Sequence, residues 1–316
     1  MIGSVDQELL WLAAGVLAVL VGASVVGAIL ARHVTSDAPR ATVTNLNDRI
    51  RAWWVMCAVF AIALLTRGIG SVLLFALISF LALREFITLT PTRHGDHRAL
   101  LWVFFVVMPI QYWLVWSDWY GLFAIFIPVF VFLLVPTRNA IAGETEHFLE
   151  RTATIQWALM ICVYCVSYAP ALLTLEFGSD ENEGAKLLLF LVIVVQSSDV
   201  AQYIWGKLFG RRQIAPTVSR NKTWEGFVGG VLTAILLGTA LWWITPFTPW
   251  QAALMSTVIA LMGFAGGLTM SAIKRDRGVK DFGALIAGHG GVLDRIDSLC
   301  FAAPVFFHLT RYFFAA

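Results

Sequence analysis

The sequence predicts an all-α fold, a polytopic bundle of transmembrane helices. Of the 316 residues, 59% are hydrophobic and only 13% are charged, whereas about a quarter of a soluble domain is charged. The mean hydropathy is +0.78. Thirteen Trp and 23 Phe suit a bundle that faces lipid and is anchored at the membrane interfaces. These features exclude a soluble or a disordered class for the chain.

The first span is expected at about 9–30. Its preceding charges, Asp6 and Glu8, are acidic, and the apolar run is long enough to cross a bilayer. A cleaved signal peptide is therefore not indicated. A polar segment, 31–52, follows, and its second half predicts a short interfacial helix that ends at Trp53 and Trp54.

Residues 53–84 are too long for one span, because a single helix of this length would be about 48 Å long. The sequence Thr66-Arg-Gly-Ile-Gly70 offers a break, so two spans are expected here. In the following loop, His94 and His97 are interpreted as interfacial residues. Further spans are predicted at 100–116, 120–136, 153–175, 187–205, 227–246, 250–273 and 299–314, which makes ten in all.

The four cysteines lie in apolar runs, and Cys162-x-x-Cys165 has no second pair, so packing is the interpretation preferred over zinc binding.

The distribution of charge predicts the topology. With the N-terminus outside, the inside loops hold 19 of the 22 Lys and Arg residues, all but Arg67, Lys186 and Arg311. This is a strong positive-inside pattern.

Chemistry is concentrated after residue 152. We therefore divide the chain into an N-terminal scaffold, 1–152, and a C-terminal catalytic part, 153–316. The stretch 271–298 lies between apolar segments. In it, Asp294 and Asp297 are three residues apart, so on a helix both carboxylates would point toward one cation. Carboxylates suit Mg²⁺, and the neighbouring Lys and Arg residues suit a polyphosphate.

A second polar stretch, 198–226, is predicted to face the same side. It holds a dense group of Lys and Arg, together with glycines and hydroxyl side chains. Asp199 lies toward the end of an apolar span, where an ionisable residue indicates function. The alternative is a basic anchor for anionic lipid headgroups. Together the two stretches predict a metal–phosphate site at a membrane surface.

Both stretches resemble a known family. The pattern Ser271-x-x-Lys274-Arg275, Lys280-Asp281 and His289-Gly-Gly-x-x-Asp294-Arg295-x-Asp297 resembles the signature of the phosphatidate cytidylyltransferases. The stretch 198–226 resembles their second conserved region. The likeness covers about 190–316, with a weaker one at Ser79–Glu85. It implies that CTP and phosphatidate give CDP-diacylglycerol and pyrophosphate with Mg²⁺, and a second cation is possible.

The resemblance also implies roles for single residues. Metal binding is expected of Asp294 and Asp297, with Asp199 as a third ligand. Catalytic roles are expected of Lys280, Asp281, His289, Asp294 and Asp297. Contacts to CTP and to lipid phosphates are expected of Lys207, Ser219, Lys222, Thr223, Ser271, Lys274, Arg275, Lys280 and Arg295, the last of which also fits a positive-inside anchor.

This sequence departs from the family pattern at four positions. Arg220 and Ala287 stand where the family usually has Pro, and Gln202 stands where it has Ala. Gly267 replaces an Asp that helps to hold metal in many members. Either the site depends on the remaining carboxylates, or Gly267 serves close helix packing.

Several alternatives stay open. The enzyme could act on another lipid phosphate or be a CTP-dependent lipid kinase. In another class, the chain would be a non-catalytic anion-binding or transport descendant, which the missing carboxylate at Gly267 favours. The expected partners are CTP, phosphatidate, the lipid bilayer and a second copy in a homodimer, with no nucleic acid. The expected location is the bacterial inner membrane, with the site facing the cytoplasm.

The predicted topology can be tested with cysteines introduced at Gln213 and Ala287. In intact cells a membrane-impermeant thiol reagent should label neither above the level of the parent protein. A cysteine at Glu181, in the loop predicted outside, should be labelled. Labelling of both Gln213→Cys and Ala287→Cys in intact cells would overturn this orientation.

Overall fold

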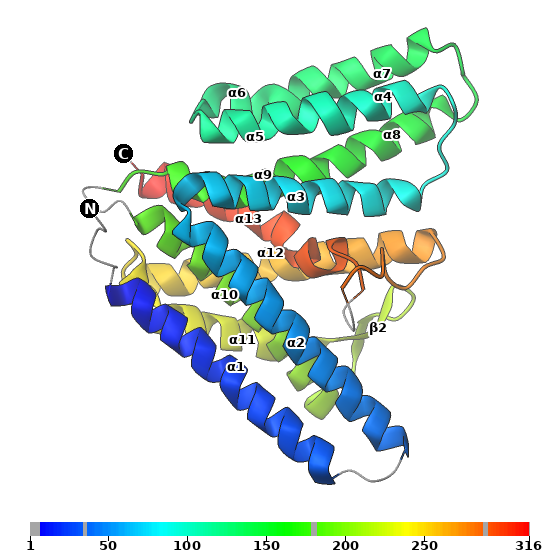
Figure 1. Ribbon diagram of the computed structural model, residues 1–316. Coiled ribbons are helices and arrows are strands. Elements are labelled where there is room, and N and C mark those ends of the chain that lie inside the picture. Colours follow the sequence, from blue (N-terminus) through cyan, green and yellow to red (C-terminus); the bar gives the residue numbers. More distant parts are fainter. Residues whose placement is uncertain (1–6, 34–36, 178–181, 287–289, 316) are drawn as a thin grey trace.

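A computed structural model describes residues 7–33, 37–177, 182–286 and 290–315 as a helical bundle (Figure 1). Ten helical segments follow one another along the described chain. Seven are single helices: α1 (Gln7–His33), α2 (Asp37–Leu65), α3 (Arg67–Thr88), α10 (Glu183–Phe209), α11 (Trp224–Ala240), α12 (Pro249–Asp276) and α13 (Leu293–Phe313).

The other three segments each contain a π-helical turn. They are α4 (Asp96–Trp102), η1 (Val103–Val107) and α5 (Met108–Trp116); α6 (Tyr120–Ile125), η2 (Phe126–Val131) and α7 (Phe132–Ile141); and α8 (Phe148–Leu159), η3 (Met160–Cys165), α9 (Val166–Ala171) and the 3₁₀ turn η4 (Leu172–Thr174). Pro128 lies within η2 and Pro109 lies just beyond η1. Proline removes a backbone donor, so a widened turn at these positions accommodates the lost hydrogen bond.

The all-α polytopic class is confirmed. Seven of the segments described are long and apolar enough to cross a membrane: 7–33, 68–88, 96–116, 120–141, 148–174, 183–209 and 249–276. The segments α2, α11 and α13 do not meet these criteria, and α11 has only 17 residues. The ten helical segments lie where ten spans were expected, but the number of crossings stays a prediction.

The predicted break at Thr66–Gly70 is where α2 ends and α3 begins. The Thr66 hydroxyl donates to the Ala63 carbonyl oxygen at 2.9 Å and so satisfies an acceptor at the end of α2. The separate interfacial helix expected before Trp53 is not present as such. That segment is the first half of α2, because no Gly or Pro interrupts the chain between Arg40 and Leu65.

The C-terminal helices form the centre of the bundle. Helix α10 packs against α11 and α12, and α12 packs against α13, while α3 and α9 cover α13 from the other side (Figure 1). The largest fully buried side chains of the core are aromatic and include Tyr168, Phe190, Phe306 and Phe307. The α1–α2 hairpin leans away from this centre, and α4–α7 form an outer layer (Figure 1).

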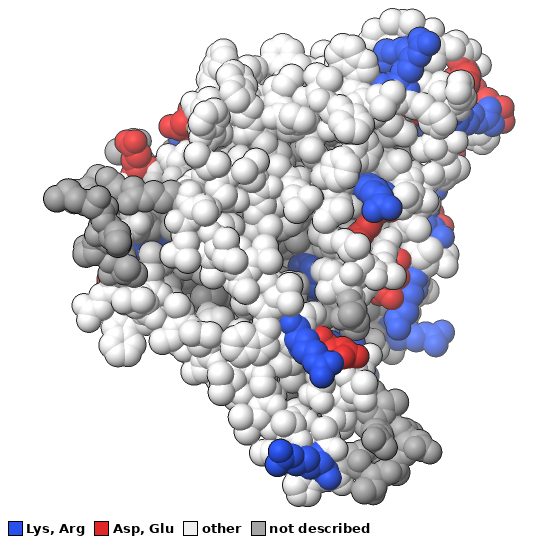
Figure 2. Space-filling view, in the orientation of Figure 1, with Lys and Arg blue, Asp and Glu red and all other residues white. Residues whose placement is uncertain are grey.

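The two polar stretches lie at one end of the bundle, as predicted from the even number of spans expected between them. The β-hairpin of β1 (Gln213–Ala215) and β2 (Ser219–Thr223), the α12–α13 connection and the α7–α8 connection are all found there (Figure 1). Figure 2 shows that most Lys and Arg side chains on this face lie toward the same edge. The first described turn of α1 and the last of α13 lie at the opposite end.

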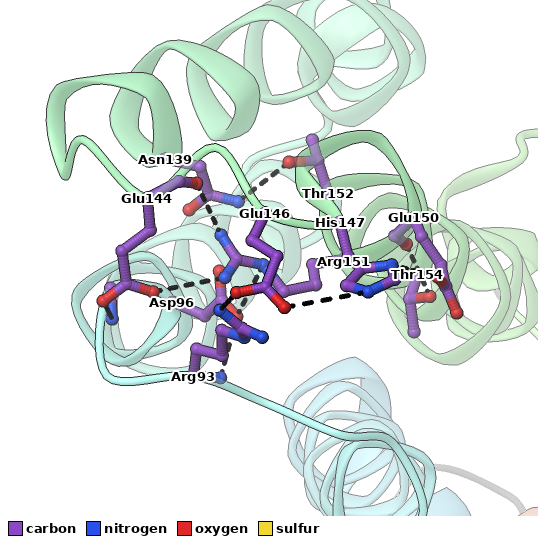
Figure 3. A network of polar contacts seen from close by, with 11 residues as sticks. Arg93, Asp96, Asn139, Glu144, Glu146, His147, Glu150, Arg151, Thr152 and Thr154 are labelled. Carbon is purple, nitrogen blue, oxygen red and sulfur yellow. Dashed lines mark hydrogen bonds and ion pairs between the residues drawn. The ribbon is translucent and has the colours of Figure 1, made fainter.

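At the end that holds the polar stretches, a polar network joins α4 to α8 (Figure 3). Arg151 and Asp96 are both buried, and Arg151 Nε lies 3.4 Å from Asp96 Oδ2. Arg151 also donates to Glu144, at 3.2 Å to Oε2 and 3.0 Å to the backbone carbonyl oxygen. Around this buried pair, Arg93 and Glu146 form an ion pair that is open to solvent. The buried pair therefore fastens the outer helical layer to the end of the bundle.

Removal of Arg151 should be costly, because it leaves the Asp96 carboxylate buried without its cation. We expect Arg151→Ala to lower the free energy of unfolding by about 3–5 kcal/mol. The matched control is Arg93→Ala, which breaks the exposed pair with Glu146 and should cost much less, because solvent screens an exposed ion pair. Thermal unfolding of the purified protein in detergent would measure both. Equal losses in the two variants would contradict a structural role for the buried pair.

Candidate functional site

Four helix ends supply the candidate site. The stretch 271–298 is not one loop, because Ser271–Asp276 form the last turns of α12 and Leu293 begins α13. Likewise, 198–209 are the last turns of α10, and Trp224 begins α11. The site therefore lies where α10 and α12 end and where α11 and α13 start (Figure 1).

Close contact between α10 and α11 brings the β-hairpin over these ends. A β-carbon at Gly226 would lie 2.7 Å from the Gln202 carbonyl oxygen and 3.0 Å from the Cα of Gly206. The Thr223 hydroxyl accepts the Gly226 N–H at 3.1 Å and caps α11. These two glycines therefore serve helix packing, and their contact sets the position of Lys222 on β2.

Asp294 is the most fully bonded carboxylate of the site. It is 7% exposed. Its Oδ1 accepts from Lys274 Nζ at 2.8 Å, and its Oδ2 accepts the backbone N–H groups of Phe282 at 2.8 Å and Gly291 at 2.9 Å. Charge-assisted bonds of this kind are the strong ones. Asp294 therefore holds the middle and the end of the α12–α13 connection and neutralises Lys274.

Asp297 faces a different group of side chains. A β-carbon at Gly267 on α12 would lie 3.1 Å from Lys222 Nζ, 3.4 Å from Ser298 Oγ and 4.0 Å from Asp297 Oδ2. Asp199 on α10 interacts electrostatically with Asp297 and Lys222. A cation from β2 and two carboxylates from α10 and α13 thus meet beside a glycine of α12.

Two aromatic rings orient the cations of the site. Lys222 Nζ lies 4.8 Å from the centre of the Phe264 ring, and Lys274 Nζ lies 5.3 Å from that of Phe282. Burial lowers the pKa of Lys222, and the carboxylates of Asp199 and Asp297 oppose this shift. Asp294 is bonded directly to Lys274, whereas Lys222 interacts electrostatically with both Asp199 and Asp297, and Lys274 also acts on Asp297.

The three carboxylates expected to bind metal do not form one cluster. Among the residues the structure describes, no three His, Cys, Asp or Glu side chains are close enough to hold a metal ion. Asp294 and Asp297 share one side of α13, but Asp294 is occupied by Lys274 and two amides. The remaining pair, Asp199 and Asp297, matches in number what Mg²⁺ usually takes from a protein, which is one or two carboxylates together with phosphate oxygens.

Three of the residues predicted to contact phosphate are bonded to the backbone in this structure, and their contacts with phosphate stay a prediction. Thr223 caps α11, as described above. The Ser271 hydroxyl donates to the Gly267 carbonyl oxygen at 2.6 Å. Arg275 donates from Nε to the Val218 carbonyl oxygen and from Nη1 to that of Val279, both at 3.2 Å, so it ties the β-hairpin to the α12–α13 connection. The partner of Thr223 is a backbone N–H and those of Ser271 and Arg275 are backbone carbonyl oxygens, which the residue pattern does not reveal.

The other predicted residues lie around the rim or inside. Lys207, Lys280 and Asp281 are exposed. Ser219 begins β2 and is half-buried. Arg295 Nε is buried and, among the described atoms, has no hydrogen-bond partner. His289 and Ala287 lie outside the described residues.

Glu85 of α3 also belongs to the site, although it was not among the predicted site residues. Its Oε1 accepts the Val292 N–H and its Oε2 accepts the Leu293 N–H, both at 2.9 Å. More than 200 residues separate these partners in the sequence. The only sequence signal was the weak family likeness at Ser79–Glu85, which carries no information about what Glu85 contacts.

Comparison with known proteins extends the resemblance to nearly the whole chain. The sequence pattern of the cytidylyltransferase family matches residues 47–313. YnbB, an uncharacterized protein of Escherichia coli (strain K12), is 40% identical over 300 residues, which cover 94% of this chain and 97% of that protein. The phosphatidate cytidylyltransferase of Bacillus subtilis (strain 168) is 31% identical over 252 residues, covering 79% and 88%. That of Mycobacterium leprae is 37% identical over 175 residues, covering 54% and 53%.

The contacts of Gly266 and Gly267 separate helix packing from site geometry. A β-carbon at Gly266 would lie 2.5 Å from the Asp297 carbonyl oxygen, so Gly266→Ala should destabilise the protein by about 1–3 kcal/mol. At Gly267 the nearest atom is the end of the flexible Lys222 side chain. Gly267→Ala should therefore be close to neutral, with a gain in helix propensity of up to ~1 kcal/mol. Thermal unfolding of both variants tests this, and the reverse order would assign packing to Gly267.

Proposed function

Because the chain belongs to the cytidylyltransferase family, we propose that it transfers a cytidylyl group from CTP to phosphatidate, giving CDP-diacylglycerol and pyrophosphate. The family and its named relatives make the chain a membrane-embedded nucleotidyltransferase. One observation carries the finer proposal. Lys222, Asp199 and Asp297 meet beside Gly267 at the end of an apolar bundle, where a nucleotide from water can meet a lipid phosphate.

The proposed reaction makes one bond and breaks one. An oxygen of the lipid phosphate attacks the α-phosphorus of CTP, and the bond to the oxygen that bridges to the β-phosphate breaks, so the electron pair leaves with pyrophosphate. The nucleophile is already ionised, so no strong general base is needed. Catalysis then comes from positioning and from neutralising the negative charge that gathers on the phosphates.

In this scheme Lys222 binds a phosphate oxygen, and Asp199 and Asp297 would hold Mg²⁺. The ion would neutralise phosphate charge when bound. Asp294 keeps Lys274 and the α12–α13 connection in place. The exposed side chains Lys207 and Lys280 are suited to collect the nucleotide from solution, because a local positive field raises the encounter rate with an anion.

Two finer predictions accompany this function. The positive-inside pattern supports a site on the cytoplasmic side of a bacterial inner membrane. A homodimer is proposed on the basis of the family likeness. The competing function is a non-catalytic descendant that binds anions, and the absence of a carboxylate at Gly267 is the feature in its favour.

The decisive experiment incubates the purified protein with CTP, Mg²⁺ and a panel of lipid phosphates and detects CDP-lipid by mass spectrometry. We expect a product from phosphatidate, with pyrophosphate released in equal amount. A product from a different lipid phosphate alone would change the substrate and keep the reaction class. If bound CTP is detected but no lipid in the panel yields product, the descendant function replaces the proposal.

The assignment of Asp297 can be tested in the same assay. Asp297→Asn should lower the turnover by on the order of 10² or more, because it removes charge where the cation is expected. The control is Asp276→Asn, since this carboxylate is exposed at the end of α12. Near-normal turnover of Asp297→Asn would reject this metal assignment.

Gly267→Asp should lower the Mg²⁺ concentration for half-maximal rate, because it adds a carboxylate close to Lys222 and Asp297.

A further inference from the structure

The start of α13 is held by a carboxylate from the N-terminal part of the chain. Glu85 lies near the end of α3 and presents one oxygen to each of two successive backbone N–H groups, those of Val292 and Leu293, at 2.9 Å. The first N–H groups of a helix have no partner within the helix. They also carry the positive end of the helix dipole, which favours a negative charge. Glu85 thus caps α13 from a different helix.

The chain around Glu85 is shaped to admit its carboxylate. A β-carbon at Gly291 would lie 2.7 Å from Glu85 Cδ, and one at Gly283 would lie 2.8 Å from the same atom. Neither position could carry a larger side chain without displacing the carboxylate. Next to Glu85, the ring of Phe86 stacks on Phe282 with ring centres 6.1 Å apart. The end of α3 therefore contacts the middle of the α12–α13 connection, at Phe282 and Gly283, and its end, at Gly291.

These contacts lead directly to the site. Leu293 is the first residue of α13, and Asp294 follows it. The Phe282 N–H donates to Asp294 Oδ2, and Asp294 Oδ1 binds Lys274. Asp297, which faces Lys222, lies one turn further along α13. A shift of the first turn of α13 would move Asp294 and Asp297 together.

We propose that Glu85 is a positioning residue of the site. Its carboxylate fixes the first turn of α13 and thereby sets the places of Asp294 and Asp297. The role requires an acceptor on both oxygens, so an amide of the same size does not replace it. The consequence for the reaction rests on the proposed cytidylyl transfer, whereas the contact with the two amides does not.

Hydrogen exchange tests the contact without any assay of activity. In Glu85→Gln the side-chain NH₂ would face one of the two backbone donors, so the amides of Val292 and Leu293 should exchange roughly tenfold faster or more. Glu85→Asp keeps the charge on a shorter side chain and should lie between the wild type and Glu85→Gln. The matched control is Glu150→Gln, an exposed carboxylate at the start of α8. Unchanged exchange at 292–293 in Glu85→Gln would overturn the proposal.

Kinetics test the consequence for the reaction. Glu85→Gln should lower kcat by roughly tenfold or more and raise the Mg²⁺ concentration for half-maximal rate, because Asp297 moves with α13. Glu85→Asp should recover part of both. A residue that only stabilised the fold would lower the amount of active protein and leave the Mg²⁺ dependence unchanged.

The two arms separate the possible failures. If the wild type forms CDP-lipid, and Glu85→Gln exchanges faster but keeps its kcat and Mg²⁺ dependence, the positioning role is wrong while the proposed function stands. If the wild type forms no CDP-lipid, the proposed function fails, and the exchange at 292–293 alone decides whether Glu85 fixes α13. If Glu85→Gln yields too little folded protein, Glu85→Asp is measured in both arms in its place.

Discussion

The site depends on the way in which Asp294 is bonded. Its carboxylate binds Lys274 and accepts two backbone N–H groups of the α12–α13 connection. A buried charge is tolerated only when it is paired and hydrogen-bonded. The bonds that meet this requirement also fold the polar connection back over the helix ends. The geometry of the neighbouring carboxylates follows, because Asp297 lies on the same helix one turn away.

This bonding gives two carboxylates of one motif different tasks. Asp294 is bonded to three groups of the protein, whereas Asp297 and Asp199 lie near Lys222 beside Gly267, and Lys274 also acts on Asp297 from further away. Mg²⁺ retains water and takes up phosphate oxygens readily, so a pair of carboxylates is an adequate protein contribution to its site. The glycine at 267 leaves the space next to Lys222 free of a side chain. At the four helix ends, Asp294 thus has a structural role, whereas Asp297 and Asp199 are available to a ligand.

The free backbone groups of helix ends and connections explain why several polar side chains of the site bond to the backbone. Helix ends near hydrocarbon need partners for their free N–H and C=O groups. Thr223 and Glu85 accept the free N–H groups of α11 and α13. Arg275 donates to carbonyl oxygens of the β-hairpin and of the α12–α13 connection. The division of the chain at residue 152 therefore marks where the sequence motifs lie. It does not delimit the site, because Glu85 of α3 also contributes to it.

The sequence by itself determined the all-α membrane class, the break before α3, the shared end of the two polar stretches and the family likeness. Hydropathy, glycine position and charge asymmetry are local properties, and each reports one such feature. Only the tertiary structure decided which carboxylate is hydrogen-bonded to Lys274, because Asp294 and Asp297 share a side of one helix. It also showed Glu85 at the start of α13. That contact joins distant parts of the chain, and no periodicity or spacing encodes it.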